Sequence, residues 1–323
     1  MRAVQVTEFG DRDVLEVNEV ETPEPDSGEV RIEVKAAGIN FADIMQRRGH
    51  YQGGPKPPYT PGLEVAGVID AVGDGVGREV GDEVVTMVDG AGGYAEYAIG
   101  DAMGLFDIPE GLSFEAAAGF PVQYLTAQNC LHEWGGLEED ESVLIHAAAG
   151  GVGTAAVQIA REAGAEIFGT ASTQEKLDKA ASLGADHTIN YEEEDFVEVV
   201  KEKTDYGVDL VLDGVGGETT QRSLDALKEF GRMVVYGAAS GTPGRPSTDD
   251  ILFGNQKVIG YHLGRGLQRK PMKVLASVNE LSEMLAEGKL EVQFDRAFDL
   301  DEVADAHEYV ESRQSMGKVV ITP

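Results

Sequence analysis

The sequence predicts an α/β protein in which a doubly wound parallel sheet is inserted into a β-rich domain. Three observations support this prediction: short alternating runs in the first third of the chain, a regular change between strand and helix patterns in the middle, and a glycine-rich turn between a strand and a helix. We expect three segments, at residues 1–122, 123–265 and 266–323, of which the last returns to the first domain.

The first segment is rich in short strands. Residues 29–36 alternate between apolar and polar side chains, and the runs at 65–72, 83–88 and 94–99 look similar, with glycine clusters between them. Few helices are expected there, among them one at residues 40–47. These patterns predict a lobe of strands joined by tight turns.

The middle of the chain alternates between strands and helices. The expected strands are residues 142–146, 166–170, 187–190, 208–213, 232–236 and 258–261. The expected helices between them are residues 152–163, 174–183, 196–203 and 219–228. Such alternation is typical of a parallel sheet covered on both faces, which binds its ligand outside the carboxyl ends of the strands. Beyond it we expect a long helix at 272–287, a second helix at 303–312 and a last strand at 318–321.

The glycine-rich turn runs from His146 to Thr154, directly after the first of these strands. A Rossmann dinucleotide-binding turn has three glycines in the pattern Gly-x-Gly-x-x-Gly, and this chain has Ala148, Gly150 and Gly153 at those positions. Gly151 and Val152 open the helix that follows. Glycines there let backbone N–H groups approach a pyrophosphate at the positive end of the helix. The turn therefore predicts a nucleotide-binding site.

The end of the second parallel strand indicates which nucleotide is bound. About 20 residues past the glycines, an NAD-binding unit has a carboxylate for the ribose 2′-OH. This chain has Ala171 and Ser172 instead, and Lys176 follows near the start of the next helix. A neutral, hydroxyl-bearing turn with a nearby cation suits a 2′-phosphate, which a carboxylate would repel. We therefore expect NADPH as the cofactor; for Lys176 alone, the alternative interpretation is a solvated helix-face charge.

The composition excludes some classes of partner. The chain has 58 acidic and 26 basic residues, with a formal net charge of −32 spread over both halves. Such a surface repels nucleic acid and anionic membranes, and we interpret it as adaptation of a halophile protein to high salt. The single cysteine, Cys130, excludes an internal disulfide and a cysteine-built zinc site. No signal peptide or membrane span is evident, so we expect a cytoplasmic protein.

Three motifs together resemble one family. They are Gly38-Ile39-Asn40-Phe41-Ala42-Asp43, Pro61-Gly62-Leu63-Glu64-Val65-Ala66-Gly67 and the Ala-Ala-Ala-Gly-Gly-Val-Gly turn. The chain is similar from end to end to the medium-chain dehydrogenase/reductase superfamily, and within it to the zinc-independent quinone oxidoreductases of the zeta-crystallin-like and VAT-1-like branches. The resemblance implies that the β-rich domain is GroES-like.

The resemblance also bears on metal binding. Zinc-dependent relatives have a cysteine where Asn40 stands and a histidine where Leu63 stands, so we expect no metal site in this chain. Without a Lewis acid, the substrate must itself accept hydride readily, as a quinone or an α,β-unsaturated carbonyl does. The main task of the protein is then to align the nicotinamide with the acceptor.

The remaining site residues are implied by the resemblance. Asn40 corresponds to a polar residue beside the nicotinamide and substrate, and Tyr51 to a substrate-pocket tyrosine that would hydrogen-bond the acceptor oxygen. The other positions that match cofactor contacts of the family are Thr126, Lys176, Tyr191, Gly237, Ala238, Leu263 and Arg313. Among these, Lys176, Tyr191 and Arg313 match residues around the 2′-phosphate and the far cofactor contacts.

The resemblance leaves three functions open. The first is an NADPH-dependent, zinc-free quinone reductase, and the second is an enoyl or 2-alkenal reductase on the same scaffold. The third is a nucleotide-binding protein with little catalysis that acts through RNA or membrane association, which the net charge of −32 disfavours. A homodimer is expected, formed through the sheet edge near residues 258–261.

Overall fold

The computed structural model describes all residues, 1–323, as two compact units. The terminal unit comprises Met1–Val122 and Val292–Pro323, and the inserted unit comprises Gln123–Glu291. One unit is built around a mixed sheet and the other around a parallel sheet, so the predicted fold class is confirmed.

The terminal unit is a β-rich domain with few helices. Its main sheet has seven strands, in the order β14 (Phe294–Asp299), β15 (Lys318–Thr322), β3 (Glu29–Gly38), β4 (Glu64–Val72), β5 (Glu83–Met87) and β7 (Leu105–Asp107), with β6 (Tyr97–Asp101) paired to β3. A separate antiparallel pair joins β1 (Arg2–Val6) to β2 (Leu15–Glu19). The helices are α1 (Phe41–Arg47), α2 (Phe114–Ala117) and α12 (Val303–Glu311).

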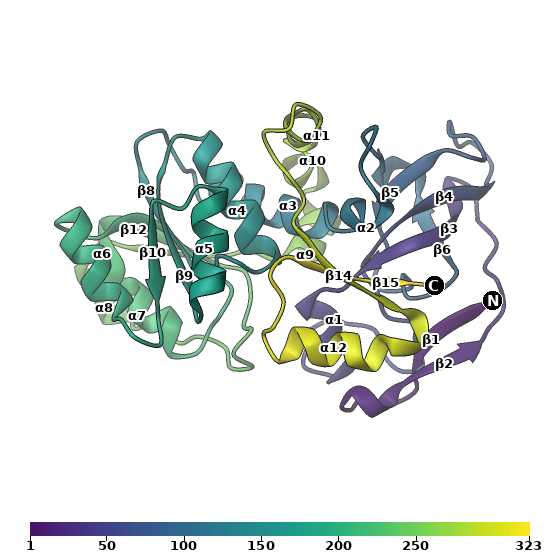
Figure 1. Ribbon diagram of the computed structural model, residues 1–323, viewed down its shortest axis with the longest axis horizontal. Helices are drawn as coiled ribbons and strands as arrows, with labels where there is room; N and C mark the ends of the chain where they lie inside the picture. The colour runs from purple at the N-terminus through teal and green to yellow at the C-terminus, as the bar shows by residue number, and fades with distance from the viewer. The chain divides into compact units, whose positions relative to one another are not determined.

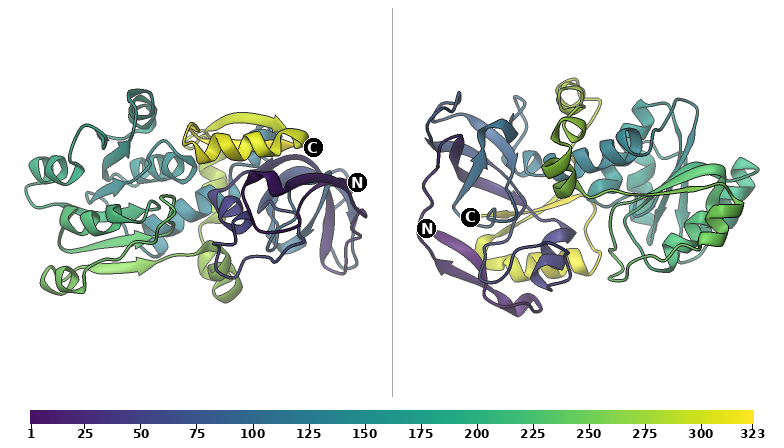
Figure 2. Two further views of the ribbon diagram at one scale, coloured as in Figure 1. Left: turned by 90° about the horizontal axis from the view of Figure 1, so that it is seen from below. Right: turned by 180° about the vertical axis from the view of Figure 1, so that it is seen from behind.

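Strand β3 is the centre of this unit because its alternation buries one face. Val30, Ile32 and Val34 lie in the main core cluster. The C-terminal strand β15 pairs with the other end of β3, where Val320 faces Gly38. Figure 2 shows α12 and β15 lying among the N-terminal elements. The pairing therefore brings the end of the chain beside the segment that leads into α1.

The inserted unit contains a parallel sheet of six strands. Their order is β10 (His187–Asn190), β9 (Glu166–Ala171), β8 (Ser142–Ile145), β11 (Val208–Asp213), β12 (Leu227–Val235) and β13 (Lys257–Gly260). The helices of this unit are α3 (Pro121–Gln128), α4 (Gly151–Glu162), α5 (Gln174–Leu183), α6 (Phe196–Thr204), α7 (Glu218–Ala226), α8 (Thr248–Phe253), α9 (Leu263–Arg269), α10 (Pro271–Val274) and α11 (Val278–Ala286).

Helices cover both faces of this parallel sheet. The central strands β8 and β11 are buried along their whole length, as expected for strands with no solvated face. In Figure 1 the strands lie between α4 and α5 on one side and α6, α7 and α8 on the other. Because all six strands run the same way, their carboxyl ends meet at one edge of the sheet.

Two expectations about the third segment are wrong. The single helix expected at 272–287 is broken into α10 and α11, since Pro271 begins a new helix and a turn at 275–277 separates the two. The return to the terminal unit also starts at Val292 rather than at residue 266. Residues before this point are tied to the inserted unit: Asn129 Nδ2 donates to the Val274 carbonyl at 3.0 Å, and Glu291 N donates to Gln158 Oε1 at 2.8 Å.

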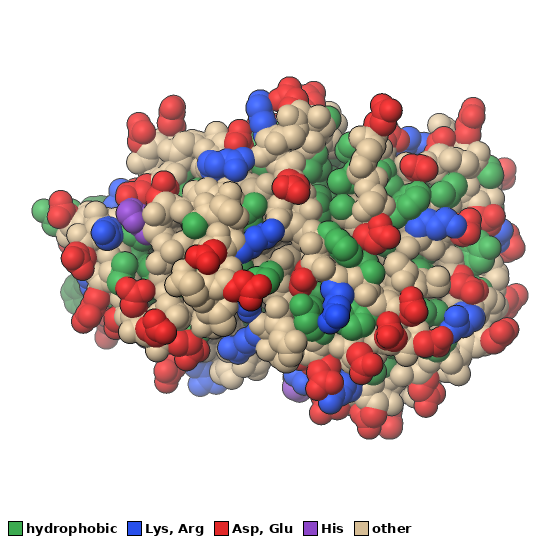
Figure 3. All heavy atoms as spheres, in the orientation of Figure 1, with side chains coloured by type: hydrophobic (Ala, Val, Ile, Leu, Met, Phe, Trp, Pro, Cys, Tyr) green, Lys and Arg blue, Asp and Glu red, His purple; other side chains and the backbone are tan.

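Carboxylates are spread over the surface of both units. Figure 3 shows acidic side chains across the whole visible face, with fewer basic ones among them. No helix is long and apolar enough to span a membrane. In a protein of net charge −32, the surface carboxylates repel one another at low ionic strength, where screening is weak.

The salt requirement is testable by unfolding in a KCl series. We expect the free energy of unfolding to rise with KCl concentration, because counterions screen the repulsion among the surface carboxylates. Denaturant titration at each salt concentration measures it. Full stability below about 0.1 M salt would contradict a salt-adapted surface.

Candidate functional site

The glycine-rich turn joins β8 to α4 at the carboxyl edge of the parallel sheet. Gly150 is the N-cap of α4, with φ −80° and ψ 177°, and the helix runs for 12 residues from Gly151. The first N–H groups of such a helix have no partner within it and form the positive end of its dipole. The predicted strand, turn and helix are therefore present in the order that suits a pyrophosphate.

The three fingerprint positions serve different physical purposes. A Cβ on Gly153 would collide with the Ala147 carbonyl oxygen and lie 2.8 Å from Ala148 Cα, so this glycine is needed for packing the turn against the helix. A Cβ on Gly150 would lie 3.2 Å from the Ala147 carbonyl oxygen with no other heavy atom within 4 Å. The fold itself therefore has room for a side chain at Gly150, and the open space there is available to a ligand.

Ala148, which stands at the first fingerprint position, is fully buried and its N–H donates to the Thr170 carbonyl at 3.0 Å. Its Cβ occupies space that a side chain at Gly169 would need, since a Cβ there would approach within 3.0 Å. The missing glycine of the turn is thus compensated by a glycine on the neighbouring strand β9.

Three of the residues expected around a 2′-phosphate, Ser172, Lys176 and Tyr191, lie just after β9 and β10. Ser172 follows β9, and Lys176 lies in the first turn of α5, which Thr173 caps by accepting from Lys176 N at 3.4 Å. Tyr191 N donates to the Ala171 carbonyl at 3.2 Å, which places Tyr191 beside the end of β9. Tyr191 is 38% exposed, so its ring is available to a ligand.

Two further loops lie at the same edge of the sheet. The loop after β12 carries Gly237 and Ala238 and is tied to the loop after β11, because Ala239 N donates to the Gly214 carbonyl at 2.9 Å. A Cβ on Gly237 would lie 2.8 Å from that same carbonyl oxygen. This glycine therefore permits close packing of two loops. Leu263 is the first residue of α9, after β13.

Asp213 is a functional candidate that the sequence reasoning missed. Its carboxylate is fully buried at the end of β11 and accepts from Val215 N at 2.8 Å, Gly216 N at 3.0 Å and Thr220 Oγ1 at 2.5 Å. These bonds fix the loop Asp-Gly-Val-Gly-Gly that lies next to the glycine turn. The cluster of glycines directly after a buried strand was the available sequence signal.

His146, the first residue of the turn, is a fixed neutral histidine. Its Nε2 lies 2.9 Å from Ser223 Oγ, and Ser223 Oγ already donates to the Thr219 carbonyl at 2.7 Å, so Nε2 carries the proton. Nδ1 then accepts from Thr170 Oγ1 at 3.1 Å. Burial lowers the pKa of His146 to about 4. The ring is thus a structural link between β8, β9 and α7.

This depressed pKa makes a prediction about acid stability. The unfolded histidine has a pKa near 6.5, so between about pH 6.5 and 4 the unfolded chain binds a proton that the folded protein does not. Stability is therefore lost as the pH falls through this window, by about 3 kcal/mol at full titration of His146 alone.

Denaturant unfolding of the parent and of His146→Gln as a function of pH measures this loss. The variant should lose stability less steeply than the parent between pH 6.5 and 4. The half-buried His187, whose Nε2 contacts Glu166 at 2.9 Å, provides the control His187→Gln. Equal slopes for His146→Gln and the parent would contradict the assignment.

The terminal unit holds a buried polar cluster around Asn40. Its amide Nδ2 donates to Glu64 Oε1 at 2.9 Å and to the Gly38 carbonyl at 3.3 Å, and its Oδ1 accepts from Lys318 Nζ at 3.0 Å. Glu64 and Lys318 are fully buried and form an ion pair, and Glu64 Oε2 also accepts from Val122 N at 2.8 Å. Both amide hydrogens of Asn40 are therefore engaged within the protein.

Gly38 makes room for this ion pair. A Cβ there would lie 2.5 Å from Lys318 Cε and 2.9 Å from Glu64 Cγ. Strand β15 brings Lys318 to this place, although 278 positions separate it from Asn40. Nothing in the local sequence around Lys318 distinguishes it from an ordinary surface lysine, so it was missed.

Asp43 extends the cluster toward the core. One oxygen, Oδ2, accepts from Asn40 N at 2.8 Å and from Tyr94 Oη at 3.0 Å, whereas Oδ1 has no partner. Burial raises the pKa of Asp43 to about 7. The Asp43 carboxylate caps the start of α1, as expected for an acidic residue at a helix N-terminus. With a pKa of about 7, it is partly protonated near neutral pH.

The other predicted residues lie in different parts of the chain. Thr126 is buried on α3 in the inserted unit. Tyr51 follows α1 in the terminal unit and is partly buried. Arg313, also in the terminal unit, directly follows the C-cap of α12 with a left-handed φ of 57°. The structure thus places the other nucleotide candidates of the inserted unit at one sheet edge, Thr126 on α3, and Asn40, Tyr51 and Arg313 in the terminal unit.

No group of three or more His, Cys, Asp or Glu side chains is placed to hold a metal ion. The single Cys130 is fully buried, which raises the pKa of its thiol. The polar atoms of the Asn40 cluster bond to one another instead.

Two family models match the chain. The model described as alcohol dehydrogenase GroES-like domain matches residues 26–110, and the one described as zinc-binding dehydrogenase matches residues 151–281. Among curated proteins, a synaptic vesicle membrane protein VAT-1 homolog of Danio rerio is 36% identical over 99% of this chain and 70% of its own length. A 2-haloacrylate reductase of Burkholderia is 37% identical over 94% of each chain.

Solved structures agree with these relatives. The quinone oxidoreductase of Escherichia coli, complexed with NADPH, is 34% identical and superposes with a TM-score of 0.92 over the full length of both chains. The chain therefore belongs to the quinone oxidoreductase and VAT-1-like family of the medium-chain dehydrogenase/reductase superfamily.

Proposed function

We propose that this protein is an NADPH-dependent reductase that transfers hydride to a quinone without a metal ion. The observation that carries the proposal is the end of β9, where Ser172, Lys176 and Tyr191 stand together with no carboxylate in place of the usual ribose ligand. The open space at Gly150 and the N-terminus of α4 support nucleotide binding at the same edge.

Different residues would contact different parts of the cofactor. The N–H groups at the start of α4 suit the pyrophosphate, while the Ser172 hydroxyl and the Lys176 ammonium suit the 2′-phosphate. Thr126, Ala238 and Leu263 are candidates for the nicotinamide half, and Arg313 remains a candidate for the adenosine phosphate. When bound, the cofactor supplies the hydride from its reduced nicotinamide.

A catalytic zinc does not fit the residues of the terminal unit. Zinc needs three protein ligands from thiolate, imidazole or carboxylate groups. Here Asn40 and Leu63 stand at the family's ligand positions, and the Glu64 carboxylate is neutralised by the buried Lys318 ammonium. A second cation at this place would be repelled, so the acceptor must be reducible without Lewis-acid help.

The contacts of Asn40 separate the roles of the two predicted catalytic residues. Both of its amide hydrogens are committed to Glu64 and Gly38, so Asn40 has no N–H left for the acceptor oxygen. We assign stabilisation of the developing negative charge to the Tyr51 hydroxyl, as the resemblance implies, whereas the Asn40 side-chain oxygen is held by Lys318 Nζ. Reduction of an α,β-unsaturated carbonyl is the second candidate, favoured by the similarity to a 2-haloacrylate reductase.

Steady-state assays with matched acceptors test the function. NADPH oxidation should be faster with a naphthoquinone or phenanthrenequinone than with a 2-alkenal, and Tyr51→Phe should lower kcat about tenfold or more. Faster reduction of the 2-alkenal would establish the second candidate. Binding of NADPH without turnover on either acceptor would overturn both.

The choice of cofactor is tested at Lys176. Lys176→Ala should weaken NADPH binding by about tenfold or more, because a charge-assisted contact to phosphate contributes about 1.5–3 kcal/mol. NADH binding should not change, and Lys201→Ala on α6 is a control that should affect neither cofactor. An equal loss for both cofactors, or NADH binding as tight as NADPH in the parent, would contradict the assignment.

We also propose a homodimer through β13, which is an edge strand of the parallel sheet and presents unpaired backbone groups. Light scattering at high salt should give twice the chain mass, whereas a monomer mass would exclude it. The cytoplasmic location stays a prediction from the sequence.

A further inference from the structure

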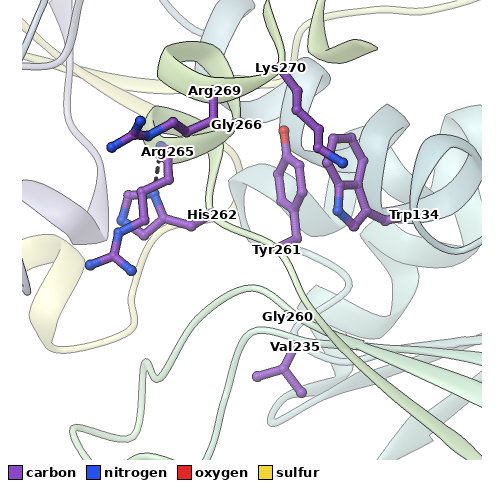
Figure 4. Close-up of a pocket in the computed structure, with 9 residues that line it drawn as sticks. All are labelled: Trp134, Val235, Gly260, Tyr261, His262, Arg265, Gly266, Arg269 and Lys270. Carbon is purple, nitrogen blue, oxygen red and sulfur yellow. Dashed lines mark hydrogen bonds between the residues drawn. The ribbon is translucent and has the colours of Figure 1, made fainter.

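A pocket lies at the end of the parallel sheet, next to Leu263, which is one of the cofactor candidates. Its volume is about 470 Å³, within the range of small-molecule sites. It is formed by the ends of β12 and β13, by α9 and by the segment after α3. The residues that line it are Trp134, Val235, Gly260, Tyr261, His262, Arg265, Gly266, Arg269 and Lys270 (Figure 4).

Three cations line this pocket in a strongly acidic protein. Arg265, Arg269 and Lys270 are exposed side chains with no carboxylate at ion-pair distance, whereas Lys273, one turn further on, lies 4.0 Å from Glu133. No acidic residue occurs between Asp250 and Glu280, although the chain carries 58 of them. The pocket is therefore a local region of positive charge on a molecule of net charge −32.

Tyr261 supplies a buried hydrogen-bond donor without an acceptor. The residue is 5% exposed, and its hydroxyl has no partner within the protein. Burial raises the pKa of Tyr261 well above its ordinary value, so the hydroxyl keeps its proton. Buried polar groups are almost always satisfied, and an acceptor supplied by a ligand in the pocket would satisfy this one.

The remaining wall is aromatic, and its two rings meet nearly edge to face, with an angle of 67° between their planes. The Trp134 and Tyr261 rings have their centroids 4.9 Å apart, and Lys273 Nζ lies 4.4 Å from the Trp134 centroid. Figure 4 shows Tyr261 and Lys270 next to the Trp134 ring, with Arg265 and Arg269 across the pocket. Aromatic surface of this kind suits an apolar group, so a bare inorganic ion would leave it unused.

We propose that this pocket binds an organic anion, a carboxylate carried on a flat aromatic or unsaturated body. Its oxygens would accept from the Tyr261 hydroxyl and the surrounding cations, and its body would lie against Trp134. The pocket lies three strands from the glycine turn along the order β8, β11, β12 and β13. The proposal concerns binding alone and holds whether or not the protein reduces quinones.

Trp134 is the only tryptophan of the chain, so its fluorescence reports on this pocket directly. Benzoate and its neutral isostere benzamide are titrated at constant ionic strength, with inorganic phosphate as a further probe. Benzoate should change the fluorescence saturably and bind at least about tenfold more tightly than benzamide or phosphate. Equal affinity for benzoate and benzamide, or no saturable change, would overturn the proposal.

Substitutions in the pocket test whether benzoate binds there. Arg265→Gln, Arg269→Gln and Tyr261→Phe should each weaken benzoate binding about threefold or more, while Arg245→Gln, an exposed arginine outside the pocket, should not. Arg265 and Arg269 are solvent-exposed, so their variants keep the fold, which thermal melting verifies. Parent-like benzoate binding by both arginine variants would overturn the proposal.

Calorimetry with NADPH tests whether the pocket binds a separate organic acid or a phosphate of the cofactor. Benzoate should still bind to protein saturated with NADPH, because the ligand is a separate organic acid. Displacement of benzoate by NADPH would overturn the proposal, since the cations would then serve a phosphate of the cofactor.

Discussion

Lys318→Met should destabilise the protein by about 3–5 kcal/mol, because it leaves the Glu64 carboxylate buried without its counter-ion. Glu64 is fully buried, and its other partners are the Asn40 amide and the Val122 N–H. Methionine fills most of the volume of the lysine stem, so the loss reports charge rather than a cavity. Denaturant unfolding at constant KCl measures it.

A second substitution separates this effect from a general loss of packing. Adding Glu64→Gln to Lys318→Met removes the unpaired charge and should recover more than half of the lost stability. Lys35→Met is the control: Lys35 pairs with Glu33 at a partly exposed site, so the substitution should cost less than about 1 kcal/mol. If the double variant is as unstable as Lys318→Met, the buried charge is not the cause.

Gly150→Ala should weaken cofactor binding strongly while leaving stability nearly unchanged. The backbone at Gly150 has a conformation that alanine adopts readily, and the added Cβ would meet only one protein atom at 3.2 Å. The same Cβ would stand where the pyrophosphate must approach the N–H groups of α4. We expect NADPH affinity to fall by about a hundredfold, which is about 2.7 kcal/mol.

Gly153→Ala is the matched comparison, three residues away. Its Cβ would collide with the Ala147 carbonyl, so this variant should lose about 1–3 kcal/mol of folding stability. Calorimetric titration with NADPH and denaturant unfolding of both variants distinguish the two effects. Parent-like NADPH affinity in Gly150→Ala would place the pyrophosphate elsewhere.

Much of the inserted unit was predictable because its signals are local. The strand at 208–213 and the helix at 174–183 were predicted with the bounds that β11 and α5 have in the structure. The helix expected at 219–228 ends instead at Ala226, since Leu227 and Lys228 already belong to β12. The pair β1–β2 was missed, and β2 has no buried residue that would mark it as a strand.

The candidate site was predictable only where one segment carries the chemistry. The glycine turn, Ser172 and Lys176 lie within about one βαβ unit, so spacing alone brings them together. Lys318 was missed because its partners are reached through the pairing of β15 with β3, which no local pattern reveals. The compensation of Ala148 by Gly169 likewise depends on two strands lying side by side.

The central claim is that NADPH reduces its acceptor here without a metal ion. The most direct measurement is the steady-state rate of NADPH oxidation by a phenanthrenequinone, before and after exhaustive removal of metal ions with a chelator at constant KCl. We predict the same kcat and KM in both preparations. A rate that is lost with the metal and restored by added Zn²⁺ would contradict the account.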